Sequence, residues 1–92
     1  MAGFLFDPAK NEANREKHGI GLDEFAGFDE GTTLTLPDTR IDYGEPRYRT
    51  VGLIGGVLHM IVFTHRDGMI RLISFRRAHE KERRQYEQRQ AR

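Results

Sequence analysis

The chain has 92 residues, of which 37% are hydrophobic and 32% charged, and its formal net charge is +1. This length suits one domain, 1–92, near the lower limit for folding on a hydrophobic core. No apolar run approaches the ~18 residues of a membrane span, and the N-terminal stretch lacks the features of a signal peptide. The absence of cysteine excludes disulfides and thiolate metal sites, and with the other features it predicts a cytoplasmic protein without membrane contact.

The small net charge conceals two oppositely charged halves. Residues 1–45 carry four Lys or Arg and ten Asp or Glu, a charge of −6, whereas residues 46–92 carry eleven and four, a charge of +7. A basic half attracts polyanions, of which RNA and DNA are the usual ones. The alternative is a dipolar surface whose halves neutralise each other once the chain is folded.

The first helix is predicted over residues 8–18. Asp7-Pro8 combines an N-cap acceptor with proline at the first helical position, and Gly19 is a typical helix end. The helix has few apolar residues. Four polar or basic residues fall on one side of it at helical spacing, namely Lys10, Asn14, Lys17 and His18.

A short second helix and a first strand follow. LDEFAGF, residues 22–28, is predicted to be helical, with Leu22, Phe25 and Phe28 turned inward. TTLTL predicts a short strand that ends at Pro37-Asp38, and the stretch 39–46 is expected to be a loop or weak strand.

Two hairpins complete a predicted meander of about four antiparallel strands. Gly55-Gly56 separates RYRTVGLI from VLHMIVFTHR, and Asp67-Gly68 separates the latter from MIRLISFR. Such two-residue loops favour type I′ turns and therefore fix the strand register. A last helix over about 79–90 makes the expected fold α+β, with N-terminal helices, a β-meander and a C-terminal helix.

This register sorts the strand residues onto two faces. One face is predicted to be apolar and covered by helices, with Leu53 and Leu58 beside the rows Val51–Met60–Phe75 and Arg49–Val62–Ile73. Its end row is Arg47–Thr64–Arg71, which places two arginines at one rim. The opposite face carries the rows Tyr48–Phe63–Leu72, Thr50–Ile61–Ser74 and Gly52–His59–Arg76, with Gly52 leaving room beside the other two.

The last helix has almost no apolar positions, and a helix that is polar all round seldom packs alone. Pairs such as Glu80–Arg84 and Arg83–Glu87 support it in water. We expect one side of it, including Arg83 and Tyr86, to contact a protein partner, or RNA in the partner's absence. A solvated and partly frayed helix is the alternative.

No sharp enzymatic motif occurs, and the four histidines, at positions 18, 59, 65 and 79, lack metal-ligand spacing. The Arg, Lys, His and Glu residues nevertheless suit metal-free cleavage of RNA. That reaction needs a base for the 2′-OH proton, cations for the charged phosphorane and an acid for the leaving 5′ oxygen. Histidine titrates in the right range for either proton transfer, and arginine binds phosphate with two donors.

Each of these residues also has a purely structural explanation. His18 ends a helix, where an imidazolium interacts favourably with the helix dipole. Glu45 and Arg47 form an ordinary surface ion pair in this interpretation. Arg71 and Arg76 then lie at strand edges, where their aliphatic stems cover apolar surface.

The order of these residues resembles that of the BrnT-type toxins of bacterial type II toxin–antitoxin systems. The resemblance covers about residues 4–87 and rests on FDPAKNEANREKHGI, LDEF, the D…GEPRY segment and RLISFRRA…ER…Y. The matching positions are Asp7, Lys10, Asn14, Lys17, His18, Gly19, Glu45, Arg47, Gly52, Arg71, Ser74, Arg76, Ala78, Glu82 and Tyr86.

The resemblance implies a RelE-like, barnase-related fold and a metal-independent ribonuclease that damages RNA and needs no cofactor. It also implies a ribbon-helix-helix antitoxin of the BrnA type, which forms a hetero-oligomer with the toxin. The toxin is expected to contact promoter DNA only through this antitoxin. The site residues it implies are His18, Glu45, Arg47, Arg71 and Arg76, with Lys10 and Lys17 as phosphate contacts. Glu45 or His18 accepts the proton and His18 or Lys17 donates one.

The sequence departs from the family pattern at two histidines. His79 stands where the family commonly has Thr, so the hydroxyl half of a capping box with Glu82 is missing, at a typical cost of ~1 kcal/mol. His59 stands at a usually aliphatic position. Two other functions are compatible with the residues: a non-catalytic toxin homologue that acts as a co-repressor, and a plain nucleic-acid-binding domain.

Overall fold

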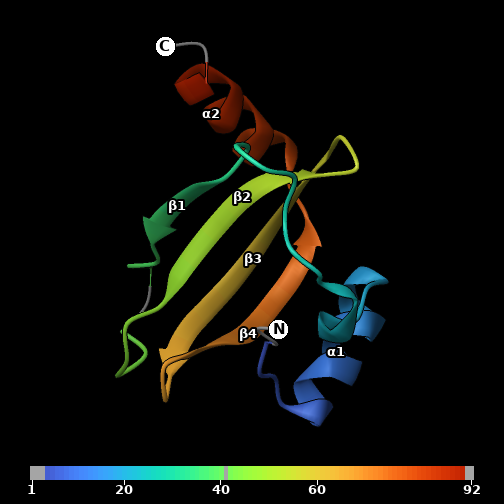
Figure 1. Cartoon of the computed structure of the whole chain (residues 1–92), viewed down its shortest axis with the longest axis vertical. Coiled ribbons are helices and arrows are strands. Elements are labelled where there is room, and N and C mark those ends of the chain that lie inside the picture. Colours follow the sequence, from blue (N-terminus) through green and yellow to red (C-terminus); the bar gives the residue numbers. More distant parts are fainter. Residues whose placement is uncertain (1–3, 41, 91–92) are drawn as a thin grey trace.

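The computed structural model describes residues 4–40 and 42–90, so both ends of the predicted domain and one residue of the predicted 39–46 loop lie outside the description. Figure 1 shows an antiparallel sheet with a helix near each end of the chain. The sheet has four strands. The strands follow in the order β1 (Leu34–Pro37), β2 (Tyr48–Ile54), β3 (Val57–Arg66) and β4 (Met69–Arg77). The helices are α1 (Pro8–His18) and α2 (Glu80–Gln90). The α+β class and the meander are confirmed.

Helix α1 begins and ends where the sequence predicts. The Asp7 carboxylate accepts a hydrogen bond from the Ala9 N–H at 2.9 Å. Gly19 ends the helix in the left-handed conformation, at φ 76°, and its N–H donates to the Arg15 carbonyl at 2.8 Å. Both caps are local, which is why the sequence alone locates them.

The predicted second helix is much shorter in the structure. Only the single 3₁₀ turn η1 (Leu22–Glu24) forms, because the backbone becomes extended at Phe25 and takes a positive φ of 111° at Gly27. The extended backbone still carries aromatic side chains into the core: Phe25 is buried and Phe28 half-buried. The inward orientation was predicted correctly, and the helix was not.

Both hairpin loops contain two residues, as predicted. Ile54 pairs with Val57 and Arg66 pairs with Met69. The loop residues have positive φ angles, including 54° at Asp67, as type I′ turns require.

A β-bulge changes the register in the middle of β4. Phe63 pairs with Leu72, but the next residue back, Val62, pairs with Ser74, so Ile73 is the extra residue. Beyond this point every residue of β4 faces the side opposite to the one predicted. Met60 therefore pairs with Arg76 instead of Phe75, and the predicted rows that contain Ile73, Ser74, Phe75 and Arg76 are wrong.

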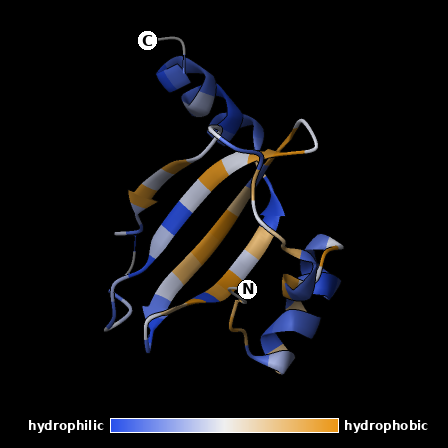
Figure 2. Ribbon diagram, in the orientation of Figure 1, coloured by the Kyte–Doolittle hydropathy of each residue, from blue (hydrophilic) through white to orange (hydrophobic). Residues whose placement is uncertain are grey.

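The core lies on the face that was predicted to be mixed. Its buried residues are Leu22, Phe25, Ile61, Phe63, Leu72 and Phe75. The ring of Phe25 lies 5.0 to 5.2 Å from those of Phe4, Phe28 and Phe75 and so joins the N-terminal segment to the sheet. The N-terminal segment also pairs with β4, since the Leu5 N–H donates to the Ile70 carbonyl at 2.9 Å. Figure 2 shows hydrophobic residues along the strands and mainly hydrophilic ones on both helices.

Gly52 and His59 both belong to this core. A Cβ on Gly52 would lie 2.8 Å from the ring of Phe28, so Gly52 makes room for that ring and not for Arg76 as predicted. His59 is buried, its Nδ1 lies 2.8 Å from the Val57 carbonyl oxygen, and its ring lies 5.6 Å from that of Phe75. It is a packed residue of the core.

The other face of the sheet, which we call the groove face, carries α2 at one end. It contains Leu34, Leu36, Arg49, Val51, Met60, Val62, Thr64, Arg71, Ser74 and Arg76.

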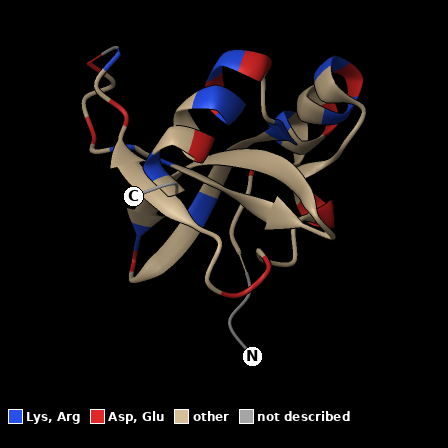
Figure 3. Cartoon of the chain, turned by 90° about the horizontal axis from the view of Figure 1, so that it is seen from above, with Lys and Arg blue, Asp and Glu red and all other residues tan. Residues whose placement is uncertain are grey.

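Figure 3 shows that charged residues alternate in sign along the helices. Within residues 4–40 and 42–90, no helix has the length and apolar character that crossing a membrane requires.

Candidate functional site

Helix α1 is fixed to the outer edge of β4 by a buried asparagine. The Asn14 side chain donates to the Phe75 carbonyl at 2.7 Å and accepts from the Phe75 N–H at 3.1 Å, as a neighbouring strand would. It also donates to the Ile20 carbonyl at 2.7 Å. Asn11 adds a hydrogen bond from the Asp23 N–H at 3.1 Å. The two buried residues of α1 are therefore amides, which explains how a helix with so few apolar residues is held.

The same side of α1 forms a hollow with the bulged part of β4. Lys10, Asn14, Lys17 and His18 line it, as their helical spacing predicts, together with Ala13, Ile73 and Ser74. Its volume is about 270 Å³. The bulge at Ile73 shapes this wall of the hollow, which we call the α1 hollow.

His18 is half-buried in the α1 hollow. Burial lowers the pKa of His18 below its ordinary value, and the positive charges of Lys17, Arg76 and His79 lower it further. The imidazole is therefore neutral at pH 7 and can accept a proton. Lys10 and Lys17 are exposed and supply positive charge around it.

Arg76 lies on the groove face, because the bulge reverses the predicted side. It is paired with α2: its two terminal nitrogens lie 2.8 and 2.7 Å from the Glu82 carboxylate oxygens. Only 12% of the Arg76 side chain and 15% of the Glu82 side chain are exposed. In this structure Arg76 holds α2 and influences His18 only through its charge.

Glu82 also accepts a hydrogen bond from the His79 N–H at 2.7 Å, so the carboxylate half of the predicted capping box is present. Burial alone would raise the pKa of Glu82, but the hydrogen bonds from Arg76 and His79 and their positive charges lower it to about 2. Glu82 is therefore ionised throughout the physiological range.

A second group of charged residues lies at the other end of the groove face, and we call it the rim. The Glu45 carboxylate lies 3.3 Å from Arg47 Nε and 3.5 Å from Arg66. The Arg47 guanidinium lies over the Tyr43 ring, 3.8 Å from its centroid. Arg71 enters the rim from β4.

The register places Arg71 in the rim. Thr64 pairs with Arg71 as predicted, and the Thr64 hydroxyl donates to the Pro46 carbonyl at 2.6 Å. The predicted proximity of Arg47 and Arg71 at one rim is therefore consistent with the structure, since Arg47 directly follows Pro46.

The rim and the α1 hollow are separate. Ser74 in the hollow is three residues along β4 from Arg71, a spacing of roughly 10 Å. Arg47 is two strands away from β4, roughly another 10 Å across the sheet. Glu45 and His18, the two predicted proton acceptors, therefore belong to different groups.

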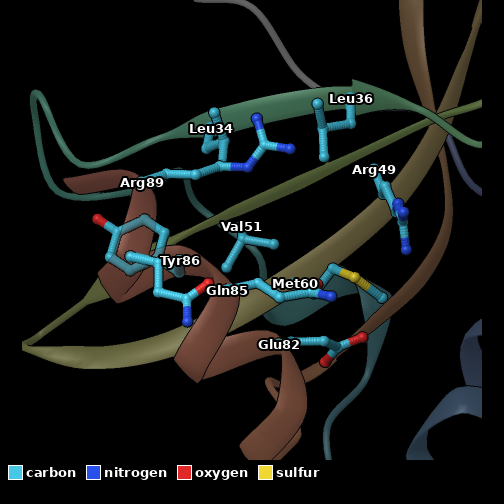
Figure 4. Close-up of a pocket in the computed structure, with 10 residues that line it drawn as sticks. Leu34, Leu36, Arg49, Val51, Met60, Glu82, Gln85, Tyr86 and Arg89 are labelled. Atoms are coloured by element: carbon cyan, nitrogen blue, oxygen red, sulfur yellow. The ribbon is translucent and has the colours of Figure 1, made fainter. Parts of the chain in front are cut away.

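A groove lies between α2 and the sheet. Its volume is about 510 Å³, and Leu34, Leu36, Arg49, Val51 and Met60 line it from the sheet (Figure 4). Tyr86 lines it from α2, and its hydroxyl donates to the Thr32 carbonyl at 2.5 Å. Arg83, the other predicted partner-binding residue, is exposed outside the groove and pairs with Glu80 at 2.6 Å.

A groove was not expected here, because this face was predicted to be covered by helices. Leu34 and Leu36 in TTLTL are the sequence signal for it, since their alternation marks one apolar side of an edge strand.

Among the described residues, no three His, Asp or Glu side chains come together as they would at a metal site.

Residues 6–82 match the family model described as "Ribonuclease toxin, BrnT, of type II toxin-antitoxin system". The chain belongs to the BrnT family. The resemblance seen in the sequence is thus confirmed: the family is one of ribonuclease toxins of type II toxin–antitoxin systems, and membership of it implies a protein antitoxin as partner. No curated protein matches the chain.

Proposed function

We propose that this BrnT toxin is a metal-independent endoribonuclease and that cleavage takes place at the α1 hollow. The observation that carries the proposal is the environment of His18. The pKa of this residue is lowered, its side chain is half-buried, and two lysines line the same concave site. Such a combination of a perturbed titratable group and a concave site is typical of catalytic centres.

The chemistry follows from these residues. Neutral His18 accepts the proton of the RNA 2′-OH, and the 2′ oxygen attacks the adjacent phosphorus. Lys10 and Lys17 stabilise the negative charge that develops on the phosphorane. Lys17 donates a proton to the leaving 5′ oxygen, so that the products are a 2′,3′-cyclic phosphate and a 5′-hydroxyl end.

In this proposal the rim binds the RNA beyond the cleaved bond. Arg47 and Arg71 contact a neighbouring phosphate, and arginine is suited to this role because it donates two hydrogen bonds at once. Tyr43 supports Arg47 through its ring. A second location for the chemistry is the rim itself, with Glu45 as the base; the 3.3 Å contact between Glu45 and Arg47 favours it.

The proposal also covers the type of antitoxin, the contact with promoter DNA and the place of action, as the family resemblance implies them. The antitoxin is of the ribbon-helix-helix, BrnA-like type, the toxin reaches promoter DNA only in complex with it, and both act in the cytoplasm. The RelE-like arrangement of helices and sheet belongs to the same set of expectations. The competing function is that of a non-catalytic toxin homologue that serves as co-repressor in the complex.

The test is cleavage of a short RNA by the purified toxin in the presence of EDTA. We expect products with 2′,3′-cyclic phosphate ends, and no cleavage where a 2′-deoxynucleotide replaces the attacking residue. Cleavage of the 2′-deoxy substrate would contradict attack by the 2′-OH, and loss of activity in EDTA would contradict metal independence. Complete inactivity towards several RNAs, together with normal growth of cells that express the toxin without antitoxin, would favour the co-repressor.

A further inference from the structure

We propose that the groove between α2 and the sheet binds a segment of the antitoxin that carries aliphatic side chains and a carboxylate. The proposal deepens the proposed function, since it assigns a location on the toxin to the protein partner and rests on that partner's existence. The groove is separate from the residues that we assign to RNA cleavage, so the two proposals fail independently.

The floor of the groove is aliphatic. Leu34 and Leu36 reach it from β1, Val51 from β2 and Met60 from β3 (Figure 4). The two leucines and Val51 remain partly exposed.

Sites for single-stranded RNA stack successive bases on several aromatic rings. Among the residues that the structure describes, Tyr86 is the one aromatic residue in the lining of this groove. It lies on the α2 wall with its hydroxyl bound to the Thr32 carbonyl, so the aliphatic floor offers no row of rings for bases. Aliphatic side chains of a protein segment fit this surface better.

The charge of the groove specifies a carboxylate. Arg49 lines the groove, and its Nε is buried without a hydrogen-bond partner among the described residues. The nearby Asp38 carboxylate is already bound by Arg40 at 2.8 and 2.9 Å. Glu82, the acidic residue of the groove lining, is bound by Arg76. An acidic side chain from a partner would complete the hydrogen bonds of Arg49.

Helix α2 forms one wall of the groove, and it leaves the groove open to a partner that binds after the toxin has folded. No described residue of α2 is buried. The helix is held to the rest of the chain by the Glu82–Arg76 pair near its start and by the Tyr86 hydroxyl farther along. A partner segment in the groove would cover the inner side of α2.

The first test measures the affinity of the toxin for its antitoxin, the product of the adjoining reading frame, by isothermal titration calorimetry. Arg49→Met removes the cation and keeps the aliphatic stem, and we expect about tenfold to hundredfold weaker binding. Arg84→Met is the matched control, because Arg84 is exposed and lies outside the groove. We expect the control to bind as the wild type does.

A second test does not depend on packing inside the sheet. The chain contains no cysteine, so a single introduced thiol can be labelled with a bulky maleimide. Gln85 lines the groove, whereas Gln90 lies outside it, about 140° further around the helix. A label attached after Gln85→Cys should weaken antitoxin binding at least tenfold, and one attached after Gln90→Cys should leave it unchanged.

RNA cleavage by the same variants separates the outcomes. Weaker antitoxin binding with unchanged cleavage by Arg49→Met and by the labelled Gln85→Cys toxin supports the proposal. Unchanged antitoxin binding overturns it, and if cleavage is lost at the same time, RNA is the occupant of the groove. If the wild-type toxin itself does not cleave RNA, the proposed function fails, and the binding measurements still decide what the groove does.

Discussion

The two helices of this toxin are both polar, but they are attached to the sheet in opposite ways. Helix α1 buries Asn11 and Asn14, and Asn14 alone makes three hydrogen bonds to backbone groups of other segments. Helix α2 buries no described residue and is held by Glu82 and Tyr86. A polar helix can therefore be part of the folded core through buried amides, or can lie over a surface that it leaves accessible.

The largest effect is expected from Asn14→Ala. The substitution leaves the buried N–H and carbonyl of Phe75 without their partners and removes the bond to Ile20. We expect the free energy of unfolding to fall by ~3 kcal/mol or more, as measured by urea denaturation. Glu16→Ala, an exposed position on the same helix, should change it by at most ~0.5 kcal/mol. Equal effects of the two substitutions would mean that α1 is not anchored through Asn14.

Glu82→Gln should have the next largest effect. The pKa of Glu82 in the folded chain, about 2, lies below its ordinary value of 4.5, so the stabilisation is complete above pH 4.5 and is lost as the pH falls towards 2. At pH 7 we expect a loss of at most about 3 kcal/mol. Thermal or urea unfolding of both proteins between pH 7 and pH 3 checks this, because their stabilities should converge as the pH falls. A constant difference over that range would contradict the role of the ionised carboxylate.

Tyr86→Phe should have a smaller effect, of ~1 kcal/mol, because it removes only the hydroxyl that donates to the Thr32 carbonyl. The consequence should be local: faster amide hydrogen exchange in α2, with little change in α1 and the central strands. Arg83→Met provides the control, since Arg83 pairs only with residues of α2. If exchange in α2 does not respond to Tyr86→Phe, the helix is held by other contacts.

The parts of the fold that depend on local sequence were predicted well. The caps of α1 and the two type I′ turns each involve a few adjacent residues with a strong conformational preference. The bulge depends on the whole sheet, and it reversed the predicted side of Arg76. A signal was present, because Leu72 and Phe75 are both large and apolar but three residues apart, and strict alternation cannot place both in one core.

The strand patterns could not predict which face of the sheet would be covered by the core. Strand β3 is apolar on both sides, with Ile61 and Phe63 on one and Met60 and Val62 on the other. Aromatic residues of irregular segments, such as Phe4 and Phe28, pack on one face of the sheet and so determine which face is covered. The sequence pattern does not specify the positions of these residues.

The candidate site was predictable only within single elements. The grouping of Lys10, Lys17 and His18 follows from helical spacing along α1. The separation of Glu45 from His18 depends on where a loop and a helix end lie on the sheet, so the sequence left both as candidates for the base. Asn14 was grouped with the functional side of α1, and its main contacts are structural.

The most direct test of the account compares His18→Gln with Glu45→Gln in RNA cleavage. We predict that His18→Gln lowers kcat/KM about 100-fold or more, whereas Glu45→Gln changes it only a few-fold. The wild-type rate should fall with decreasing pH only below the ordinary histidine value of 6.5, because the pKa of His18 is lowered. A large loss of activity in Glu45→Gln with little change in His18→Gln would contradict catalysis at the α1 hollow and place it at the rim.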